Sequence, residues 1–390
     1  MIKRHSIKRH ILVAFLLLFA LPYLLCLSVQ ADTEEKENDT ALPEEYESYL
    51  DGIPDEIKDL LPEGFFSNDA ETVGDTVSQM SDFSYLLRTV LELVGINLSD
   101  FVKTVAQIVG ILILSAIIRS VKISFRSDSI AKAFSFCTTL VITLCLISKS
   151  YLGISSVTAY FESLSKITSA TLPLMGALYA MGGNVAAAVA STAGLATFLT
   201  VLEQLIAKSI LPFCGICMAS ALISGLDPSL RTGTLASTVK KSYTTALSFL
   251  MMLLIAMLAT QTTLGARQDS LAMKSIKFAA GNWIPVVGGS VGDLFKTVST
   301  SVGYIRGTIG LSGILLLLLT LLPTLVKLFL ARAAWQLSAS VADLLGCDTE
   351  KKLLEEFASL IGYLIAAVSI TSSVLLLSFA LVTHCVSALG

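Results

Sequence analysis

One serine and one histidine could supply a nucleophile and its base in this sequence. Ser312 stands in a Gly-Leu-Ser-Gly motif at 310–313, and His384 lies in the last apolar stretch of the chain. The other two histidines lie within the first ten residues, in a segment we expect to be removed, so a zinc site with several histidine ligands is excluded. Catalysis would require Ser312 and His384 at one depth and within hydrogen-bond reach. Because such motifs are common in glycine-rich apolar stretches, we interpret this one as helix packing.

Two further motifs could also carry chemistry. Cys214 and Cys217 form a Cys-x-x-Cys pair inside an apolar run, where neither additional ligands nor a water-accessible thiolate is visible. Ser290 to Asp293 approaches the Gly-x-Gly-Asp motif of intramembrane aspartyl proteases, but serine replaces the first glycine and no second aspartate lies within a span. The sequence therefore predicts no enzyme, no catalytic residue, no cofactor and no metal site.

Glu203 is the most deeply placed charged residue in the apolar part of the chain. Gln204 follows it directly, and Lys208 comes five residues later. A charge at membrane depth is costly and usually functional. The alternative is that Glu203 sits at a helix end near the membrane surface.

A segment rich in glycine and proline, residues 273–293, separates two long apolar runs. It is too interrupted for an ordinary membrane helix and too apolar for an ordinary solvated loop. Irregular backbone at membrane depth survives only when buried in protein or lining a wet cavity. We therefore consider a re-entrant element and a loop on the membrane surface. The candidate re-entrant or packing positions, here and in similar interruptions elsewhere, are Pro173, Gly176, Pro212, Gly281, Asn282, Pro285, Gly288, Gly292, Asp293 and Pro323.

An apolar-Pro-apolar-apolar-small pattern surrounds Pro173, Pro212 and Pro285, and a weaker copy surrounds Pro323. Its spacing is compatible with a parallel internal repeat, in which 131–148 corresponds to 243–260. Paired interrupted segments in two halves of a chain point to a substrate or ion pathway in transporters. The alternative is coincidence, because chance matches among leucine, glycine and proline are common in so apolar a chain.

The composition is typical of a polytopic membrane protein. Of its 390 residues, 54% are hydrophobic and 15% charged, where soluble domains have about 25% charged residues. Residues 32–82 hold 17 of the 30 acids and only two bases. Elsewhere the bases are scattered at helix ends and form no patch, so nucleic-acid binding is not indicated.

We predict a signal peptide at 1–31, an acidic extracytoplasmic segment at 32–100 and a polytopic membrane domain at 101–390. Short helices are expected at 46–50 and 57–61, and an amphipathic helix at 83–98. The fold class is all-α, with about seven or eight transmembrane helices. The candidate spans are 103–118, 131–148, 170–183, 186–206, 209–225, 243–265, 309–331 and 357–382.

The central segment also resembles a known family. Lys277-Phe278, the run from Gly281 to Val286, Gly288 and the run from Thr308 to Leu311 are similar to the stage III sporulation protein AE family of endospore-forming bacteria. The order of signal peptide, acidic external region and polytopic part also fits that family.

The resemblance implies a function, a location and partners. It implies a structural membrane subunit of the secretion-like channel between mother cell and forespore, in the mother-cell membrane that surrounds the forespore. The implied partners are membrane lipid and the other subunits of the same sporulation complex, including a partner ATPase, because this chain contains no nucleotide-binding loop. The alternatives are a stand-alone permease for a small solute and, through Ser312 and His384, a rhomboid-like intramembrane serine protease.

Overall fold

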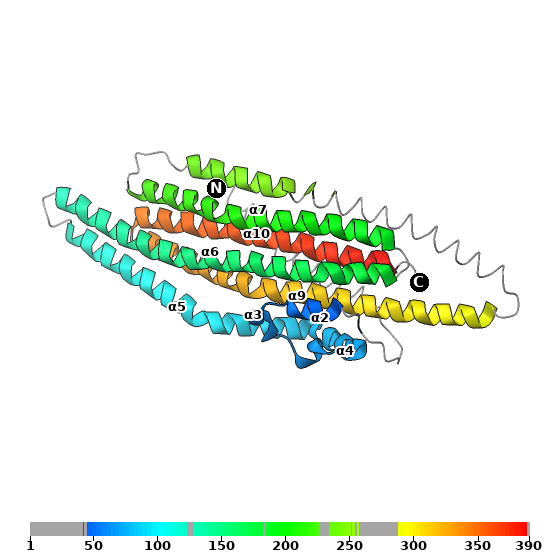
Figure 1. The fold of residues 1–390 in the computed structure, drawn as a ribbon. Coiled ribbons are helices and arrows are strands. Elements are labelled where there is room, and N and C mark those ends of the chain that lie inside the picture. The colour runs from blue at the N-terminus through cyan, green and yellow to red at the C-terminus, as the bar shows by residue number, and fades with distance from the viewer. Residues whose placement is uncertain are drawn as a thin grey trace.

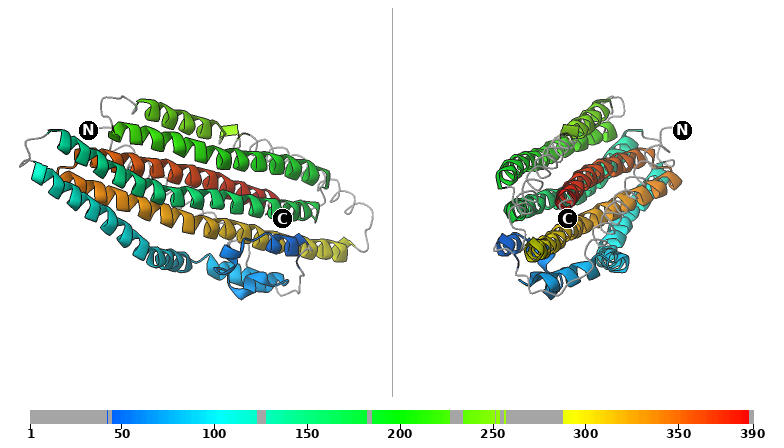
Figure 2. Two further views of the ribbon diagram at one scale, coloured as in Figure 1. Left: turned by 60° about the vertical axis from the view of Figure 1, so that its left-hand side comes forward. Right: turned by 90° about the vertical axis from the view of Figure 1, so that its right-hand side faces the viewer.

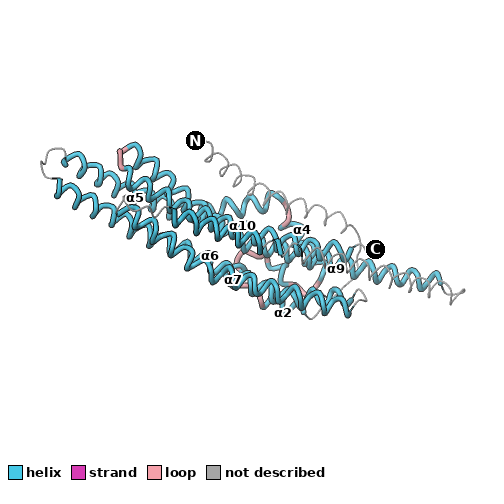
Figure 3. The backbone as a smooth tube through the Cα atoms, turned by 90° about the horizontal axis from the view of Figure 1, so that it is seen from above, coloured by secondary structure: helices cyan, strands magenta, loops and turns pink. Residues whose placement is uncertain are grey.

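Long helices make up most of this computed structural model, which describes residues 42, 45–122, 128–181, 185–226, 234–250, 252, 253, 256 and 288–387. Within these residues every regular element is a helix, connected by short loops (Figure 3). The five long helices are α5 (Phe83–Lys122), α6 (Asp128–Met181), α7 (Val185–Leu226), α9 (Gly288–Leu344) and α10 (Asp348–Ser387). A further helical stretch, 234–250, runs along the outer side of α7 (Figure 1). The predicted signal peptide lies outside the described residues.

The long helices run side by side along one common direction (Figures 1 and 2). The two most extensive helix pairs are α9 with α10 and α6 with α7, and α9 also packs against α5 and α6. The inner position of α9 follows from its sequence. Residues 308–322 include no charged side chain and are all buried, as expected for a helix that is apolar on every face.

Five helical segments in the described residues are long and apolar enough to cross a membrane. They are Phe83–Ile117, Thr139–Thr171, Glu203–Ile223, Gly307–Leu344 and Asp348–Ser373. The expected number of seven or eight is too high for this part of the chain, because α6 and α7 each combine two predicted spans. α6 contains 131–148 and most of 170–183, and α7 contains both 186–206 and 209–225.

Three prolines lie inside the long helices without ending them. Pro173 lies inside α6, Pro212 inside α7 and Pro323 inside α9. Proline removes one backbone donor, but membrane helices tolerate it where neighbouring groups satisfy the freed carbonyl. Pro173 also lies inside the predicted span 170–183 and Pro212 inside 209–225, so neither set a predicted boundary. The predicted gaps at 149–169 and 207–208 contain charged residues, but α6 and α7 continue through them as helix.

A small N-terminal unit, residues 42–82, packs against the long helices. It consists of α2 (Glu45–Asp51), α3 (Asp55–Lys58), the 3-10 helix η1 (Glu63–Phe66) and α4 (Ala70–Met80). Tyr46 and Phe65 are buried inside it, and the Tyr46 hydroxyl donates to the Phe65 carbonyl at 2.9 Å. Burial, with a smaller contribution from neighbouring Tyr49, raises the pKa of Tyr46 well above its usual range. The unit contacts α6 through α2 and α9 through α4.

One close approach fixes the N-terminal unit on α6. A Cβ added at Gly52 would collide with the Ala170 side chain. Glycine therefore lets the end of α2 lie directly against α6, and no larger residue fits without displacing α2.

The predicted boundary at residue 100 falls inside α5, which continues unbroken from Phe83 to Lys122.

The connection from α9 to α10 is a tight, hydrogen-bonded helix end. Gly346 adopts φ 67°, the left-handed conformation that glycine accepts without strain. The Cys347 amide donates to the Ala342 carbonyl at 2.8 Å, and the Gly346 amide donates to the Asp343 carbonyl at 3.1 Å. These two bonds form a Schellman motif that ends α9. α10 therefore starts at once and packs back along α9.

Candidate functional site

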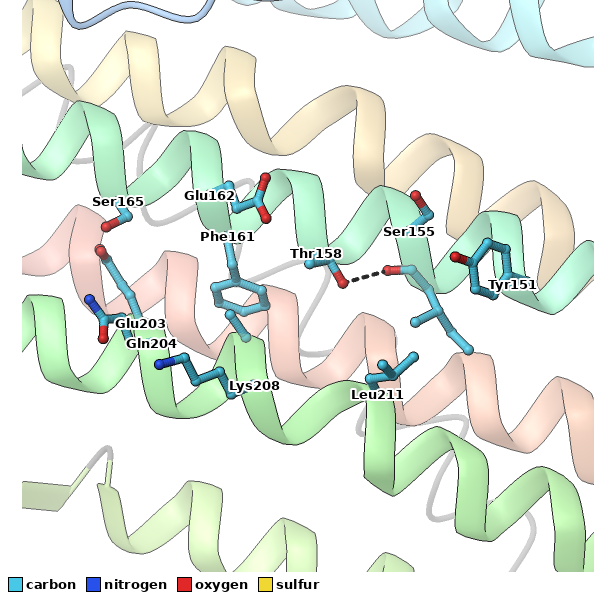
Figure 4. Close-up of a pocket in the computed structure, with 12 residues that line it drawn as sticks. Tyr151, Ser155, Thr158, Phe161, Glu162, Ser165, Glu203, Gln204, Lys208 and Leu211 are labelled. Atoms are coloured by element: carbon cyan, nitrogen blue, oxygen red, sulfur yellow. Dashed lines mark hydrogen bonds between the residues drawn. The ribbon is translucent and has the colours of Figure 1, made fainter.

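A pocket of about 590 Å³ lies between α6 and α7. Figure 4 shows its lining side chains, which come from both helices and mix apolar, hydroxyl and charged groups. The lining consists of Tyr151, Ile154, Ser155, Thr158, Phe161, Glu162, Ser165, Glu203, Gln204, Ala207, Lys208 and Leu211. The volume falls in the range typical of small-molecule sites.

Glu203 is the buried acid of this pocket. Only 1% of its surface is exposed, although it lies eighteen residues after the start of α7 at Val185. Glu203 is therefore not at the end of α7, although it is the first residue of the apolar segment Glu203–Ile223. Its Oε1 accepts a hydrogen bond from the Thr168 hydroxyl of α6 at 2.9 Å. Its Oε2 is buried and accepts no hydrogen bond from the described residues, while Ser165 lies beside the carboxylate (Figure 4).

The rim of the pocket carries charges of both signs. Glu162 of α6 and Lys208 of α7 are both exposed and line the opening. Among the described residues Lys208 forms no ion pair with Glu203 within 4.0 Å. The five-residue spacing explains this, because helix positions three or four apart face one another and positions five apart do not. The pocket thus combines a buried acid with an exposed, mixed-charge entrance.

A second polar pair lies among α6, α7 and α10. Tyr160 is buried and shares a hydrogen bond of 2.5 Å with Ser372 of α10, which is buried as well. The Ser372 hydroxyl also contacts the Val368 carbonyl one turn earlier at 2.6 Å. This pair satisfies its polar groups within the bundle, in contrast to Glu203.

A third polar group joins the helical stretch 234–250 to α10. Lys240 is 7% exposed, contacts Glu356 at 2.6 Å and lies 5.9 Å from the ring centre of Tyr363. Phe213 of α7 stacks on Tyr243 with ring centres 4.1 Å apart. These contacts attach the outer helical stretch to its neighbours, and the pairing of Lys240 with Glu356 favours a packing role.

The described residues include no metal-binding group, and the pairing of Ser312 with His384 is not tested because the His384 side chain lies outside them. Cys214 and Cys217 are free and buried, and no group of three or more His, Cys, Asp or Glu residues among the described positions could hold a metal ion. The Ser312 hydroxyl is buried and donates to the Ile309 carbonyl at 2.8 Å. His384 lies in α10.

The predicted interruption residues fall on three different helices. Pro173 and Gly176 lie in α6, Pro212 lies in α7, and Gly288, Gly292, Asp293 and Pro323 lie in α9. Pro173 and Pro212 are exposed, and Pro323 is half-buried. Gly281, Asn282 and Pro285 lie outside the described residues, so the re-entrant element and the internal repeat stay predictions.

Sequence reasoning singled out Glu203 but missed its partner. Thr168 lies 35 residues earlier on another helix, and only the register between α6 and α7 brings the two together. The available signal was weak, because Thr168 is one of many hydroxyl residues in the stretch 155–171.

Comparison with known protein families identifies the family to which the chain belongs. The family description "Stage III sporulation protein AE" matches residues 70–387, from the first residue of α4 to the last residue of α10. The chain belongs to this family. It is also similar to stage III sporulation protein AE of Bacillus subtilis strain 168, with 20% identity over 280 residues, covering 72% of this chain and 70% of that protein. No solved structure matches the chain significantly.

The family match connects sporulation with the membrane helices. It includes α5, α6, α7, α9 and α10 with all five apolar segments, and leaves out α2, α3 and η1. The α6–α7 pocket lies within the matched residues. The chain is therefore a helical membrane protein of a sporulation family.

Proposed function

We propose that this protein is a structural membrane subunit of the secretion-like channel between mother cell and forespore, located in the mother-cell membrane around the forespore. The observation that supports this most directly is the match to the sporulation family over residues 70–387. The packing of α9 and α10 supports a rigid scaffold, because both helices are largely buried within one chain. Lipid and the other subunits would cover the exposed helix faces, and a partner ATPase would supply energy.

We also propose that the subunit is not an enzyme and that its acidic N-terminal segment lies outside the cytoplasm. The Ser312 hydroxyl is engaged with the Ile309 carbonyl inside the bundle, an arrangement that favours packing over nucleophilic attack. The external placement of residues 32–82 rests on the signal-like N-terminus and the excess of acids. A cysteine introduced at Asn38 should be protected from a label restricted to the cytoplasm, and its labelling there would contradict the external placement.

The channel role is tested by recovering the tagged protein from sporulating cells with its partners. We expect the other subunits of the complex and the ATPase to be recovered together with it. Recovery of the tagged protein alone, from cells in which sporulation depends on it, would contradict the proposal. Growing cells that carry the same tagged protein are the background control.

A pair of variants sharpens this test. Gly288 begins α9, whereas Gly225 is one residue from the end of α7. We expect Gly288→Leu to reduce recovery of the partners more than Gly225→Leu. If the backbone at Gly288 approaches a neighbouring helix, as the sequence predicts, overpacking there would cost about 1–3 kcal/mol. Both variants should reach the membrane in equal amounts. Equal recovery of partners with the two variants would count against a packing role for residue 288.

One observation favours a second function, a permease for a small solute. The α6–α7 pocket has a volume of about 590 Å³ and contains a buried acid, features that solute sites in transporters share. The purified protein in sealed vesicles would take up solute without partners if it were a permease. A pure channel subunit would show no such uptake.

A further inference from the structure

We propose that the α6–α7 pocket binds a small molecule through a primary ammonium group on an apolar stem, with Glu203 as the counter-charge. This binding site does not depend on the channel role, because it rests on the pocket alone. A free alkylamine and a small zwitterion both carry this chemistry, and the experiment below distinguishes them.

The first argument is the incomplete environment of Glu203. A carboxylate removed from water is costly unless it is paired and hydrogen-bonded. Glu203 is 1% exposed, its Oε1 accepts a hydrogen bond from the Thr168 hydroxyl, and the Ser165 hydroxyl also interacts with the carboxylate. Oε2 is buried without a partner among the described residues and belongs to a residue that lines the pocket. A donor bound in the pocket would complete its coordination.

The second argument identifies the charge and shape of that donor. A metal ion would need more acidic, histidine or cysteine ligands than the described residues place around the pocket. A guanidinium group pairs best with both oxygens of a carboxylate, and Thr168 already occupies Oε1. An ammonium group is a compact charge that can donate to Oε2 and to the neighbouring Ser165 hydroxyl (Figure 4).

The third argument concerns the rest of the ligand. Ile154, Phe161 and Leu211 give the pocket an apolar wall, which suits an alkyl stem rather than a bare ammonium ion. Its volume of about 590 Å³ far exceeds the roughly 30 Å³ that one water or ammonium ion occupies. Lys208 of α7 could pair with an anionic tail, whereas Glu162 of α6 would repel one.

Binding to the purified full-length protein in lipid nanodiscs tests the proposal. The probes are butylammonium, 4-aminobutyrate, butyrate and tetramethylammonium, each titrated by calorimetry. We expect saturable binding of butylammonium or 4-aminobutyrate and no binding of butyrate, which lacks the cation. Tetramethylammonium should not bind, because it has no N–H donor. Tighter binding of 4-aminobutyrate would identify a zwitterion as the preferred class, and tighter binding of butylammonium would identify an amine.

Three variants connect the binding to the pocket. Glu203→Gln keeps an acceptor for Thr168 but loses the charge, and should weaken binding by at least about tenfold. Glu92→Gln removes an exposed acid of α5 that does not line the pocket and should change the affinity by less than about threefold. Ala207→Leu narrows the pocket without touching a charge and should also weaken binding by about tenfold.

Three results would overturn the proposal. They are no binding of either ammonium probe to the unaltered protein, equal affinity of the unaltered protein and Glu203→Gln, and binding of tetramethylammonium as strong as that of butylammonium. Folding of each variant is checked by gel filtration and thermal unfolding. If Glu203→Gln fails to fold, Ala207→Leu decides, because unchanged affinity in that variant would exclude this pocket.

Discussion

α5 and α9 are both long apolar helices, but they occupy opposite environments. In the most apolar stretch of α9, 72% of the residues are buried inside the protein, compared with 17% in α5. Leu114 of α5 is 58% exposed, whereas Leu316 of α9 is fully buried. Apolar composition therefore identifies both as membrane helices but does not tell which one faces protein and which one faces outward.

The distribution of polar residues explains part of the difference. The first half of α5 carries charged residues such as Arg88, Glu92, Asp100 and Lys103, all of them exposed. The buried stretch 308–322 of α9 has only hydroxyl groups as polar side chains, and Thr320 satisfies its own by donating to the Leu316 carbonyl. A helix without charges can be surrounded by protein on every side, whereas charged residues keep at least one face open.

The largest expected effect comes from truncating one leucine on each helix. Leu316→Ala should lower the free energy of unfolding by about 2–5 kcal/mol, because it leaves a cavity in the packed interior. Leu114→Ala should cost less than about 1 kcal/mol, since its side chain has few protein neighbours to lose. Unfolding by SDS in mixed micelles measures both. The two substitutions reduce helix hydrophobicity equally, so similar losses would mean that α5 is packed as tightly as α9.

The second comparison uses glycines with and without space around them. Gly52→Ala should destabilise the protein by about 1–3 kcal/mol, because the new methyl group collides with Ala170 and pushes α2 from α6. Gly95→Ala on α5 meets nothing within 4 Å and should stabilise its helix by up to about 1 kcal/mol. Limited proteolysis of the N-terminal unit provides the measurement. Equal cleavage of the two variants would show that α2 is not held at Gly52.

The third comparison separates backbone strain from steric space. Gly346 and Gly110 both have open space around an added Cβ, but only Gly346 has a positive φ. Gly346→Ala should cost about 1–2 kcal/mol through the left-handed conformation alone, whereas Gly110→Ala should be neutral or slightly stabilising. Thermal unfolding in one detergent compares them. An unchanged melting temperature in Gly346→Ala would argue against the Schellman end of α9.

The smallest effect concerns the N-cap of α4, the helix through which the N-terminal unit contacts α9. Hydrogen bonds from Thr72, first from its hydroxyl and then from its backbone, hold the pKa of Asp69 below its usual range. Asp69→Ala should cost about 1 kcal/mol at neutral pH. Because the folded pKa is the lower one, this contribution is complete above the unfolded value near 4 and is lost as the pH falls through the folded value.

Asp69→Asn provides the control for that pH dependence. Asparagine retains the cap but does not titrate, so the difference in stability between the unaltered protein and this variant should shrink as the pH falls below about 4. Chemical unfolding followed at several pH values isolates this difference from the many other acids of the segment. A difference that stays constant with pH would exclude Asp69 as the titrating cap.

Sequence patterns predicted which segments are helical better than where each helix begins and ends or which helix it packs against. The expected helix at 46–50 corresponds to α2 (Glu45–Asp51), and all-α membrane architecture followed directly from the apolar runs. The span count failed at 149–169 and 207–208, where charged residues interrupt the apolar runs but α6 and α7 continue as helices. The hydrogen bond between Glu203 and Thr168 likewise depends on the axial register between α6 and α7, which local sequence patterns do not contain.

The length of α6 has a mechanical consequence. Its 54 residues, at 1.5 Å each, form a rod roughly 80 Å long, and only about 30 Å of it can lie in the hydrocarbon of a bilayer. A tilt of about 5° would move one end of such a rod by about 7 Å relative to the other. The N-terminal unit grips this rod near Ala170, far from its beginning at Asp128. A force applied to the N-terminal unit would therefore tilt α6 and displace its opposite end, while the helix itself stays unchanged.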